Sequence, residues 1–356
     1  MHFRDLRRVL PSVIDSGVAI ELISAPGRGK SEFVEQLRTQ LSERDGFEWG
    51  FTTMMLATYS PADLMGYLVP TTRDDGTVAS TFTTPAWMIT PEGKHINDYK
   101  RAIVFMDEYG QGEPDTKRAS AQLILKGEIG PHKLHDGVVV IAASNREKDR
   151  SGVSKSFDFV INRRVQFEVS DDLASWEEWA FKSGIDPVFI TFANQNPHIV
   201  FADGVPDKQG PWCTPRSLVL ASKMLDKMRN PAGNIPTDPA AIEVTSGMIG
   251  QGAAAQLFAF IRLGQEMPQY ADIIAKPDSI RVPSKPDAQM LVVHSLAARV
   301  TADDVEPVLT YIQRMPQEFA VVFAKSACTR DPMLVLEGAF DSWINKNSSL
   351  MAAISA

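Results

Sequence analysis

The spacing of apolar residues in the first part of the chain predicts strands that alternate with helices. Residues 18–23 are almost wholly apolar, which is typical of a strand buried on both faces of a sheet. Residues 31–41 then carry apolar side chains at helical spacing, from Phe33 to Leu41. This period predicts a helix that buries one face against the sheet.

Further apolar runs continue the alternation. Strands are expected in four segments, 47–55, 102–106, 138–143 and 165–169, and a helix at 116–126. Residues 56–101 mix proline, glycine, threonine and charged residues, a composition that favours a hairpin or loop insertion over another strand of the sheet. Residues 127–134 contain two glycines and a proline, which indicates a turn and a small hairpin.

A glycine-rich loop joins the first strand to the first helix. Residues 24–31 read Ser-Ala-Pro-Gly-Arg-Gly-Lys-Ser, which matches the last positions of the Walker A pattern G-x-x-x-x-G-K-[ST]. A strand, a glycine turn and a helix N-terminus together form a phosphate-binding site. The residues expected to bind the nucleotide are Pro26, Gly27, Arg28, Gly29, Lys30 and Ser31.

Two of these residues have specific expected roles. Lys30 is expected along the β- and γ-phosphates of a nucleoside triphosphate, and the Ser31 hydroxyl beside Mg²⁺. Ser24 departs from the pattern, because it stands where the first glycine is usual. If that position requires a positive φ, the serine costs on the order of 1 kcal/mol, and nucleotide affinity is left open.

Two adjacent acids end the next buried run. Asp107 and Glu108 follow the apolar residues 102–106, so they are expected at the carboxyl edge of the sheet, where open α/β folds bind ligands. Asp107 is a candidate to hold Mg²⁺, and Glu108 a candidate to orient and deprotonate the attacking water. A polar strand end before a turn at Gly110 is the structural alternative.

Three more residues are candidates for catalysis. Asn145 follows the run 138–143, where its amide could bond both the γ-phosphate and the water, although asparagine is also a frequent turn former. Arg163 precedes the last expected strand and could reach a neighbouring subunit's γ-phosphate as an arginine finger, with Arg164 the other candidate. Arg216 is expected in the first turn of a helix capped by Thr214, where a cation opposes the helix dipole and so suggests an anionic partner.

Composition narrows the setting. The chain has 356 residues, 44% of them hydrophobic, and a net charge of −8. No apolar run approaches the roughly 18 residues of a membrane span, the charged N-terminus is unlike a secretory signal, and two cysteines are too few for a disulfide framework. A cytoplasmic location fits these features best. His132 and His135 are three residues apart, but the sequence around them has no cysteine and no cluster of acidic residues. A solvated or hairpin pair of histidines is therefore favoured over a metal site.

The motifs of residues 11–225 resemble those of the AAA+ ATPases, and within them the MoxR-like branch. The matching segments are Walker A at 24–31, Walker B at 103–108, sensor 1 at Asn145, the arginine finger at Asn162-Arg163 and sensor 2 at 214–216. Residues 60–66 look like the helix 2 insertion of that branch, the hairpin at 127–134 like its pre-sensor 1 hairpin, and residues 176–180 like the start of its lid.

The resemblance implies an architecture and an activity. It implies an α/β P-loop domain over 1–169, with a parallel sheet flanked by helices, followed over 170–356 by an α-helical lid with a C-terminal helical extension. It also implies a ring, usually a hexamer, that hydrolyses ATP with Mg²⁺ to remodel or activate client proteins. Many such proteins work with a partner that contains a von Willebrand factor A domain.

Two other functions stay open. An AAA+ motor or loader acting on nucleic acid would use the basic residues near the hairpin, Lys126, His132 and Lys133, although the chain has no block of lysine or arginine and its net charge is negative. A nucleotide-gated scaffold would need binding without hydrolysis. The presence together of Glu108, Asn145, Arg163 and Arg216 disfavours it. The client, the partner, the ring size and a cellular or phage origin are not encoded in these patterns.

Overall fold

The computed structural model describes residues 1–149, 152–153, 157–170 and 172–347. The chain divides into two compact units. The first contains Met1–Asp171 together with the short segment Asp203–Val205, and the second contains Asp172–Ala202 and the chain from Pro206 onward.

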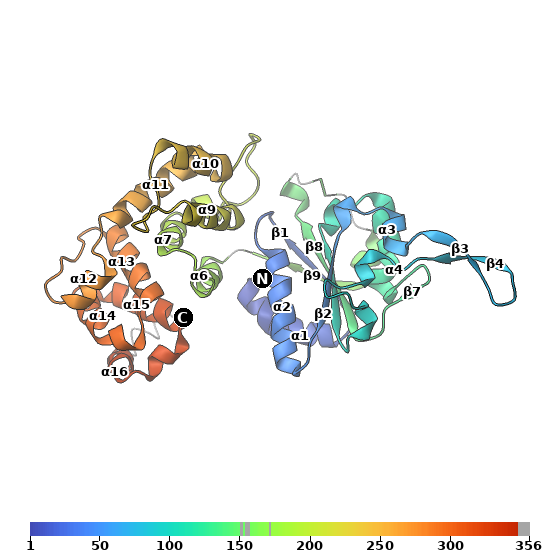
Figure 1. Cartoon of the computed structure of the whole chain (residues 1–356), viewed down its shortest axis with the longest axis horizontal. Helices are drawn as coiled ribbons and strands as arrows, with labels where there is room; N and C mark the ends of the chain where they lie inside the picture. Colours follow the sequence, from blue (N-terminus) through green and yellow to red (C-terminus); the bar gives the residue numbers. More distant parts are fainter. Residues whose placement is uncertain (150–151, 154–156, 171, 348–356) are drawn as a thin grey trace. The chain divides into compact units, whose positions relative to one another are not determined.

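A parallel sheet forms the centre of the first unit, with the strand order β2-β5-β8-β1-β9 (Figure 1). Its strands are β1 (Ala19–Ser24), β2 (Gly50–Met55), β5 (Ala102–Asp107), β8 (Val138–Asn145) and β9 (Arg164–Glu168). The carboxyl ends of parallel strands meet at one edge of the sheet. The predicted α/β P-loop sheet is therefore confirmed, and the strand expected to carry Asn145 lies between the strands of the acids and of the glycine-rich loop.

Helices cover both faces of this sheet. The helices of the first unit are α1 (Phe3–Asp15), α2 (Lys30–Asp45), α3 (Pro61–Met65), α4 (Pro114–Lys126) and α5 (Asp158–Ile161). Ile20 and Leu22 of β1 share a core cluster with residues of α1 and α2. Because alternate residues of a strand face opposite sides, Glu21 between them faces the α4 side of the sheet.

The second strand is shorter than its sequence pattern predicts. Residues 47–49 are held against α2, where the Trp49 amide donates to Ser42 Oγ and its indole N–H donates to Asp45, each at 3.0 Å. The first bond to the neighbouring strand's segment is made by the Gly50 amide, which donates to the Arg101 carbonyl. Because Trp49 is bonded to α2, β2 begins only at Gly50.

The insertion after β2 contains a projecting hairpin. Its strands β3 (Leu68–Thr72) and β4 (Val78–Phe82) pair only with each other and extend away from the main sheet (Figure 1). A smaller hairpin pairs β6 (Glu128–Ile129) with β7 (His132–Lys133). The insertion, expected as a hairpin or a loop, thus contains a hairpin, and the small hairpin expected at 127–134 is present.

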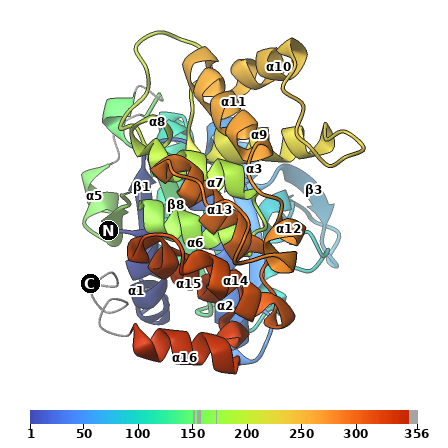
Figure 2. The ribbon, with the colours of Figure 1, turned by 90° about the vertical axis from the view of Figure 1, so that its left-hand side faces the viewer.

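The second unit is helical. Its helices are α6 (Leu173–Lys182), α7 (Pro187–Gln195), α8 (Pro197–Val200), α9 (Pro215–Lys227), α10 (Pro239–Ile249), α11 (Gln251–Gln265), α12 (Tyr270–Ala275), α13 (Pro286–Arg299), α14 (Val305–Ile312), α15 (Gln317–Arg330) and α16 (Gly338–Lys346). Helices α6, α7, α13 and α15 pack against one another around one apolar core (Figure 2). Helix α14 buries Val305, Val308, Leu309 and Ile312 in that core.

Candidate functional site: a phosphate-loop edge

The glycine-rich loop connects β1 directly to α2. Gly27 and Gly29 both adopt left-handed backbone conformations, with φ of 75° and 82°, which glycine adopts without the steric cost that a Cβ would bring. Pro26 and Gly27 form the turn, the Arg28 side chain is buried, and α2 begins at Lys30. The loop therefore presents backbone amides and a helix N-terminus to one place, as an anion site requires.

Ser24 carries no left-handed strain. It is the last residue of β1, and among the described residues Glu108 alone has a positive φ without being glycine. The condition on which serine would cost strain here is therefore not met, because β1 extends through Ser24. Its hydroxyl oxygen accepts a hydrogen bond from Lys30 Nζ at 3.1 Å.

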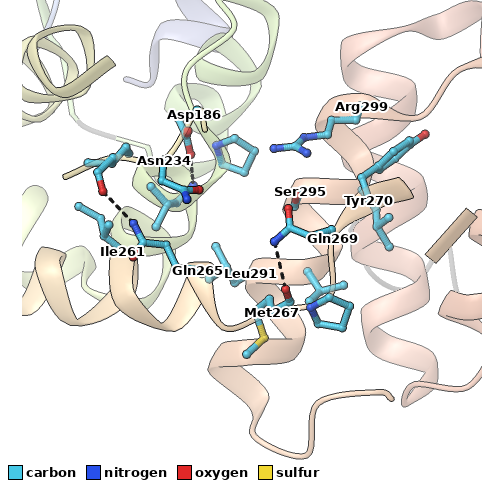
Figure 3. Close-up of a pocket in the computed structure, with 18 of the residues that line it drawn as sticks. Asp186, Asn234, Ile261, Gln265, Met267, Gln269, Tyr270, Leu291, Ser295 and Arg299 are labelled. Atoms are coloured by element: carbon cyan, nitrogen blue, oxygen red, sulfur yellow. Dashed lines mark hydrogen bonds between the residues drawn. The ribbon is translucent and has the colours of Figure 1, made fainter. Parts of the chain in front are cut away.

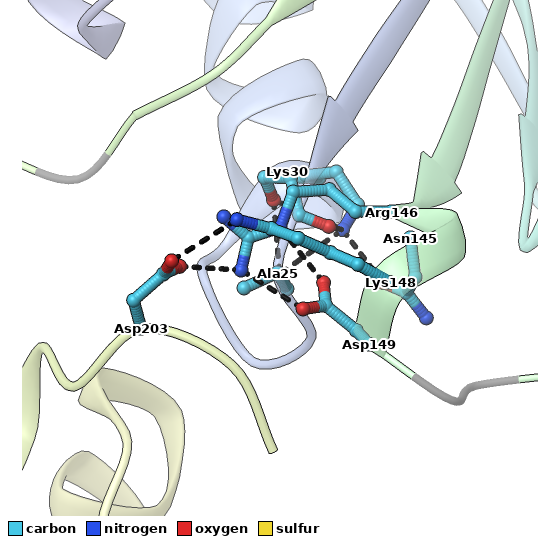
Figure 4. Close-up of polar contacts among 8 residues, drawn as sticks. Ala25, Lys30, Asn145, Arg146, Lys148, Asp149 and Asp203 are labelled. Carbon is cyan, nitrogen blue, oxygen red and sulfur yellow. Dashed lines mark hydrogen bonds and ion pairs between the residues drawn. The ribbon is translucent and has the colours of Figure 1, made fainter.

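Lys30 links the loop to β8. Its Nζ donates to Asn145 Oδ1 at 2.9 Å, and Figure 4 shows these side chains together. The sheet register explains the contact, because Ser24 at the end of β1 pairs with Asn145 at the end of β8. Two residues separated by 115 positions in the sequence thus meet at the edge where a nucleotide is expected.

A second contact joins the loop helix to β5. Ser31 Oγ donates to Asp107 Oδ2 at 2.6 Å. A hydroxyl and a carboxylate oxygen side by side are ligands that Mg²⁺ accepts in nucleotide sites. The donor set at Ser31 and Asp107 therefore fits the predicted magnesium site.

Glu108 follows Asp107 in an uncommon backbone conformation. Its φ is 52°, a left-handed value that costs a residue with a Cβ on the order of 1–2 kcal/mol. The Glu108 amide donates to Asp107 Oδ1 at 2.9 Å, and its carbonyl accepts from the Gln111 amide at 3.0 Å. Such strain is found where the fold fixes a functional side chain, which makes Glu108 the best candidate for the base.

A cluster of ion pairs beyond β8 has no counterpart in the sequence analysis. Arg146 Nε lies 2.9 Å from Asp149, and its Nη2 lies 2.6 Å from Asp203, which Lys148 also contacts at 3.1 Å (Figure 4). Arg146 holds the pKa of Asp203 below its usual value, and Lys148 adds to this effect. The segment at Asp203 is thereby tied to the turn after Asn145. No sequence motif indicates this contact, because Asp203 lies 55 residues after Lys148 in the chain.

The two arginines at 163 and 164 differ sharply in environment. Arg164 forms a buried ion pair with Glu21 at 2.6 Å, in which the two side chains are 1% and 2% exposed. Arg163 is exposed at the turn before β9. Only Arg163 is therefore placed to reach another molecule, and its role as a finger stays a prediction.

The helix start around Arg216 has the predicted form. Thr214 and Ser217 make a capping box at the start of α9, with Pro215 in the first turn. Arg216 is exposed in that turn. It belongs to the second unit, and its contact with a nucleotide stays a prediction.

The histidines near the small hairpin are structural. His132 Nε2 lies 2.9 Å from the Met65 carbonyl, and His135 Nε2 lies 2.8 Å from the Tyr99 carbonyl. Within the described part of the chain, no group of three or more histidine, cysteine or acidic residues could hold a metal ion. Nor does any helix there have the length and apolar character needed to cross a bilayer.

The second unit contains a cavity of about 340 Å³. Figure 3 shows the polar residues Gln269, Ser295 and Arg299 and the apolar Leu291 among the residues that line it. None of the residues predicted for the nucleotide site lines this cavity. It is therefore separate from the chemistry of the phosphate loop.

Comparison with known proteins gives distant structural similarity only. No protein-family model matches the chain, and no curated protein matches it. A RuvB variant from Thermotoga maritima is 11% identical over 78% of this chain and 75% of its own, with a TM-score of 0.39. NtrX from Brucella abortus is 15% identical over 92% of this chain and 67% of its own, with a TM-score of 0.38. NtrX solved in complex with ATP is 13% identical, covers 98% of this chain and 67% of its own, and has a TM-score of 0.35.

Proposed function

We propose that this protein is a magnesium-dependent ATPase of the AAA+ class. One observation carries the proposal: the loop, α2, β5 and β8 bring Lys30, Ser31, Asp107 and Asn145 together through two hydrogen bonds, of 2.9 and 2.6 Å. These are the side-chain types that phosphoryl transfer from a nucleoside triphosphate needs.

Each residue has a distinct task in this proposal. Lys30 and the loop amides hold the β- and γ-phosphates, and Asn145 keeps Lys30 oriented and bonds the γ-phosphate or the attacking water. Ser31 and Asp107 would hold Mg²⁺, which supplies charge neutralisation at the phosphates when bound. Glu108 accepts the proton of the attacking water as general base.

Phosphate release by a Glu108→Gln variant tests this assignment. Removing a general base lowers turnover by about 100-fold or more, while ATP binding persists because the loop is unchanged. Glu113→Gln is the matched control, since Glu113 is exposed and its side chain makes no cap bond at the start of α4. Normal turnover in Glu108→Gln would refute the assignment.

The finer activity follows the family resemblance. We infer that the protein works as a MoxR-like ring, usually of six subunits, that remodels client proteins with a von Willebrand factor A domain partner. Exposure of Arg163 supports its use as a finger in a neighbouring subunit's site. Arg163→Ala subunits mixed with the natural protein should then inhibit more than in proportion to their fraction. Strictly proportional activity would contradict a shared site.

A nucleic-acid substrate is the second candidate. The small hairpin offers an exposed Lys133, but Lys126 lies 3.7 Å from Glu128 and His132 is bonded to the Met65 carbonyl. These partners weaken a phosphate-binding role for the hairpin. Salt-sensitive binding of single-stranded DNA, with stimulated phosphate release, would establish this alternative.

A further inference from the structure

A buried lysine lies behind the acidic edge of the sheet. Lys117 of α4 is 1% exposed, and its Nζ donates to the Gly110 carbonyl at 2.8 Å. A lysine that is fully buried is rare, because removing an ammonium group from water is unfavourable unless charges and hydrogen bonds compensate. The position of this lysine therefore calls for a specific reason.

Charged and aromatic groups surround Lys117. Its Nζ lies 5.5 Å from the centre of the Tyr109 ring, and the Arg164 guanidinium lies 5.2 Å from the same ring. Burial lowers the pKa of Lys117 to about 8, Glu21 opposes that shift, and Arg164 adds to it. The fold thus retains a cation in surroundings that disfavour its charge.

Glu21 anchors the other side of this cluster. It accepts hydrogen bonds from Ser144 at 2.7 Å and Gln166 at 2.6 Å, in addition to its ion pair with Arg164. These partners come from β8 and β9, the strands on either side of β1. The cluster is therefore built into three adjacent strands of the sheet, β8, β1 and the edge strand β9.

The bond from Lys117 acts on the turn that follows Glu108. Glu108 has the left-handed φ of 52°, and the next residue, Tyr109, is completely buried. Gly110 packs so closely that a Cβ there would lie 3.2 Å from Ser144 Cβ. Left-handed conformations are sparsely populated and persist where surrounding contacts enforce them. The lysine supplies one of those contacts two residues after Glu108.

We propose that Lys117 is a positioning residue for Glu108: by holding the Gly110 carbonyl, it keeps the turn in the conformation that directs the Glu108 carboxylate to the attacking water. This inference rests on the proposed ATPase function. Because Lys117 acts on the turn that follows Glu108, we expect its effect to fall on turnover and not on nucleotide affinity.

The test compares Lys117→Met with Arg118→Met. Methionine keeps an unbranched apolar side chain but removes the donor, and Arg118 is the next residue on the same helix with an exposed side chain. Phosphate release gives kcat, and titration with a fluorescent ADP analogue gives Kd. We expect Lys117→Met to lower kcat about tenfold or more with Kd within about twofold, and Arg118→Met to change neither.

Other outcomes separate the two proposals. Natural protein that neither binds ADP nor releases phosphate would refute the ATPase function itself. An active natural protein with unchanged kcat in Lys117→Met, or with kcat and affinity falling together, would overturn only the role of Lys117. If Lys117→Met fails to bind ADP through misfolding, Lys117→Arg replaces it, because arginine keeps a donor. Its kcat should stay within about threefold of the natural value, and a tenfold loss at unchanged Kd would overturn the proposal.

Discussion

Replacing Arg164 by methionine should destabilise the first unit far more than the same change at Arg163. Arg164 and Glu21 form an ion pair in which both side chains are almost completely buried. Methionine retains much of the apolar stem but removes the charge partner of the Glu21 carboxylate, which keeps its hydrogen bonds from Ser144 and Gln166. A buried charge that has lost its partner is strongly unfavourable.

The expected magnitude follows from this burial. Breaking a buried ion pair by removing one partner costs about 3–5 kcal/mol of unfolding free energy, which corresponds to a change of about 10²–10⁴-fold in the unfolding equilibrium constant. Arg163 is exposed, and a surface substitution of this kind changes stability by about 0.5 kcal/mol or less. The losses of unfolding free energy in Arg164→Met and Arg163→Met should therefore differ by about 2 kcal/mol or more.

Hydrogen exchange of peptides that cover β1 and β9 measures this difference directly. In Arg164→Met, protection of these strands should fall by the factor given above, whereas Arg163→Met should keep it. Adding Glu21→Gln to Arg164→Met should restore part of the loss, since it removes the unpaired carboxylate. Equal stability of the two single variants, or no recovery in the double variant, would refute the reasoning.

Three further predictions concern packing, thiol chemistry and capping. Gly110→Ala should lower phosphate release, because its Cβ would lie 3.0 Å from Val153 Cγ1 and 3.2 Å from Ser144 Cβ. Overpacking of this kind costs about 1–3 kcal/mol. An unchanged kcat would contradict this prediction. Burial raises the pKa of Cys213 to about 12, so at pH near 8 only about one thiol in ten thousand is a thiolate, and mass spectrometry should find alkylation by iodoacetamide slow until guanidinium unfolds the chain. Thr214→Ala should lower the stability of the second unit by about 1 kcal/mol in thermal unfolding, through loss of the α9 cap; an unchanged midpoint would argue against the capping box.

The sequence by itself determined the order of the chemical groups and the strands that carry them. An apolar run, a glycine-rich turn and a helix signal are local features, and so is a strand that ends in Asp107 and Glu108. Parallel strands bring such ends to one edge, so the meeting of Lys30 with Asn145 follows from local patterns and one rule of topology. The length of β2 did not follow, because Trp49 is held by residues of the preceding helix.

Tertiary structure decided which polar residues are buried and what they contact. Arg163 and Arg164 are the same residue type in adjacent positions, and only the pairing of β9 with β1 makes the second a buried partner of Glu21. Lys117 gave no signal in a helix of mixed composition, although it bonds the turn after Glu108. Burial and charge pairing depend on residues that the fold brings together from distant parts of the chain. Propensity and motif spacing depend on neighbours in the chain. The sequence therefore reveals the motifs and the elements that carry them, but not which polar residues are buried or paired.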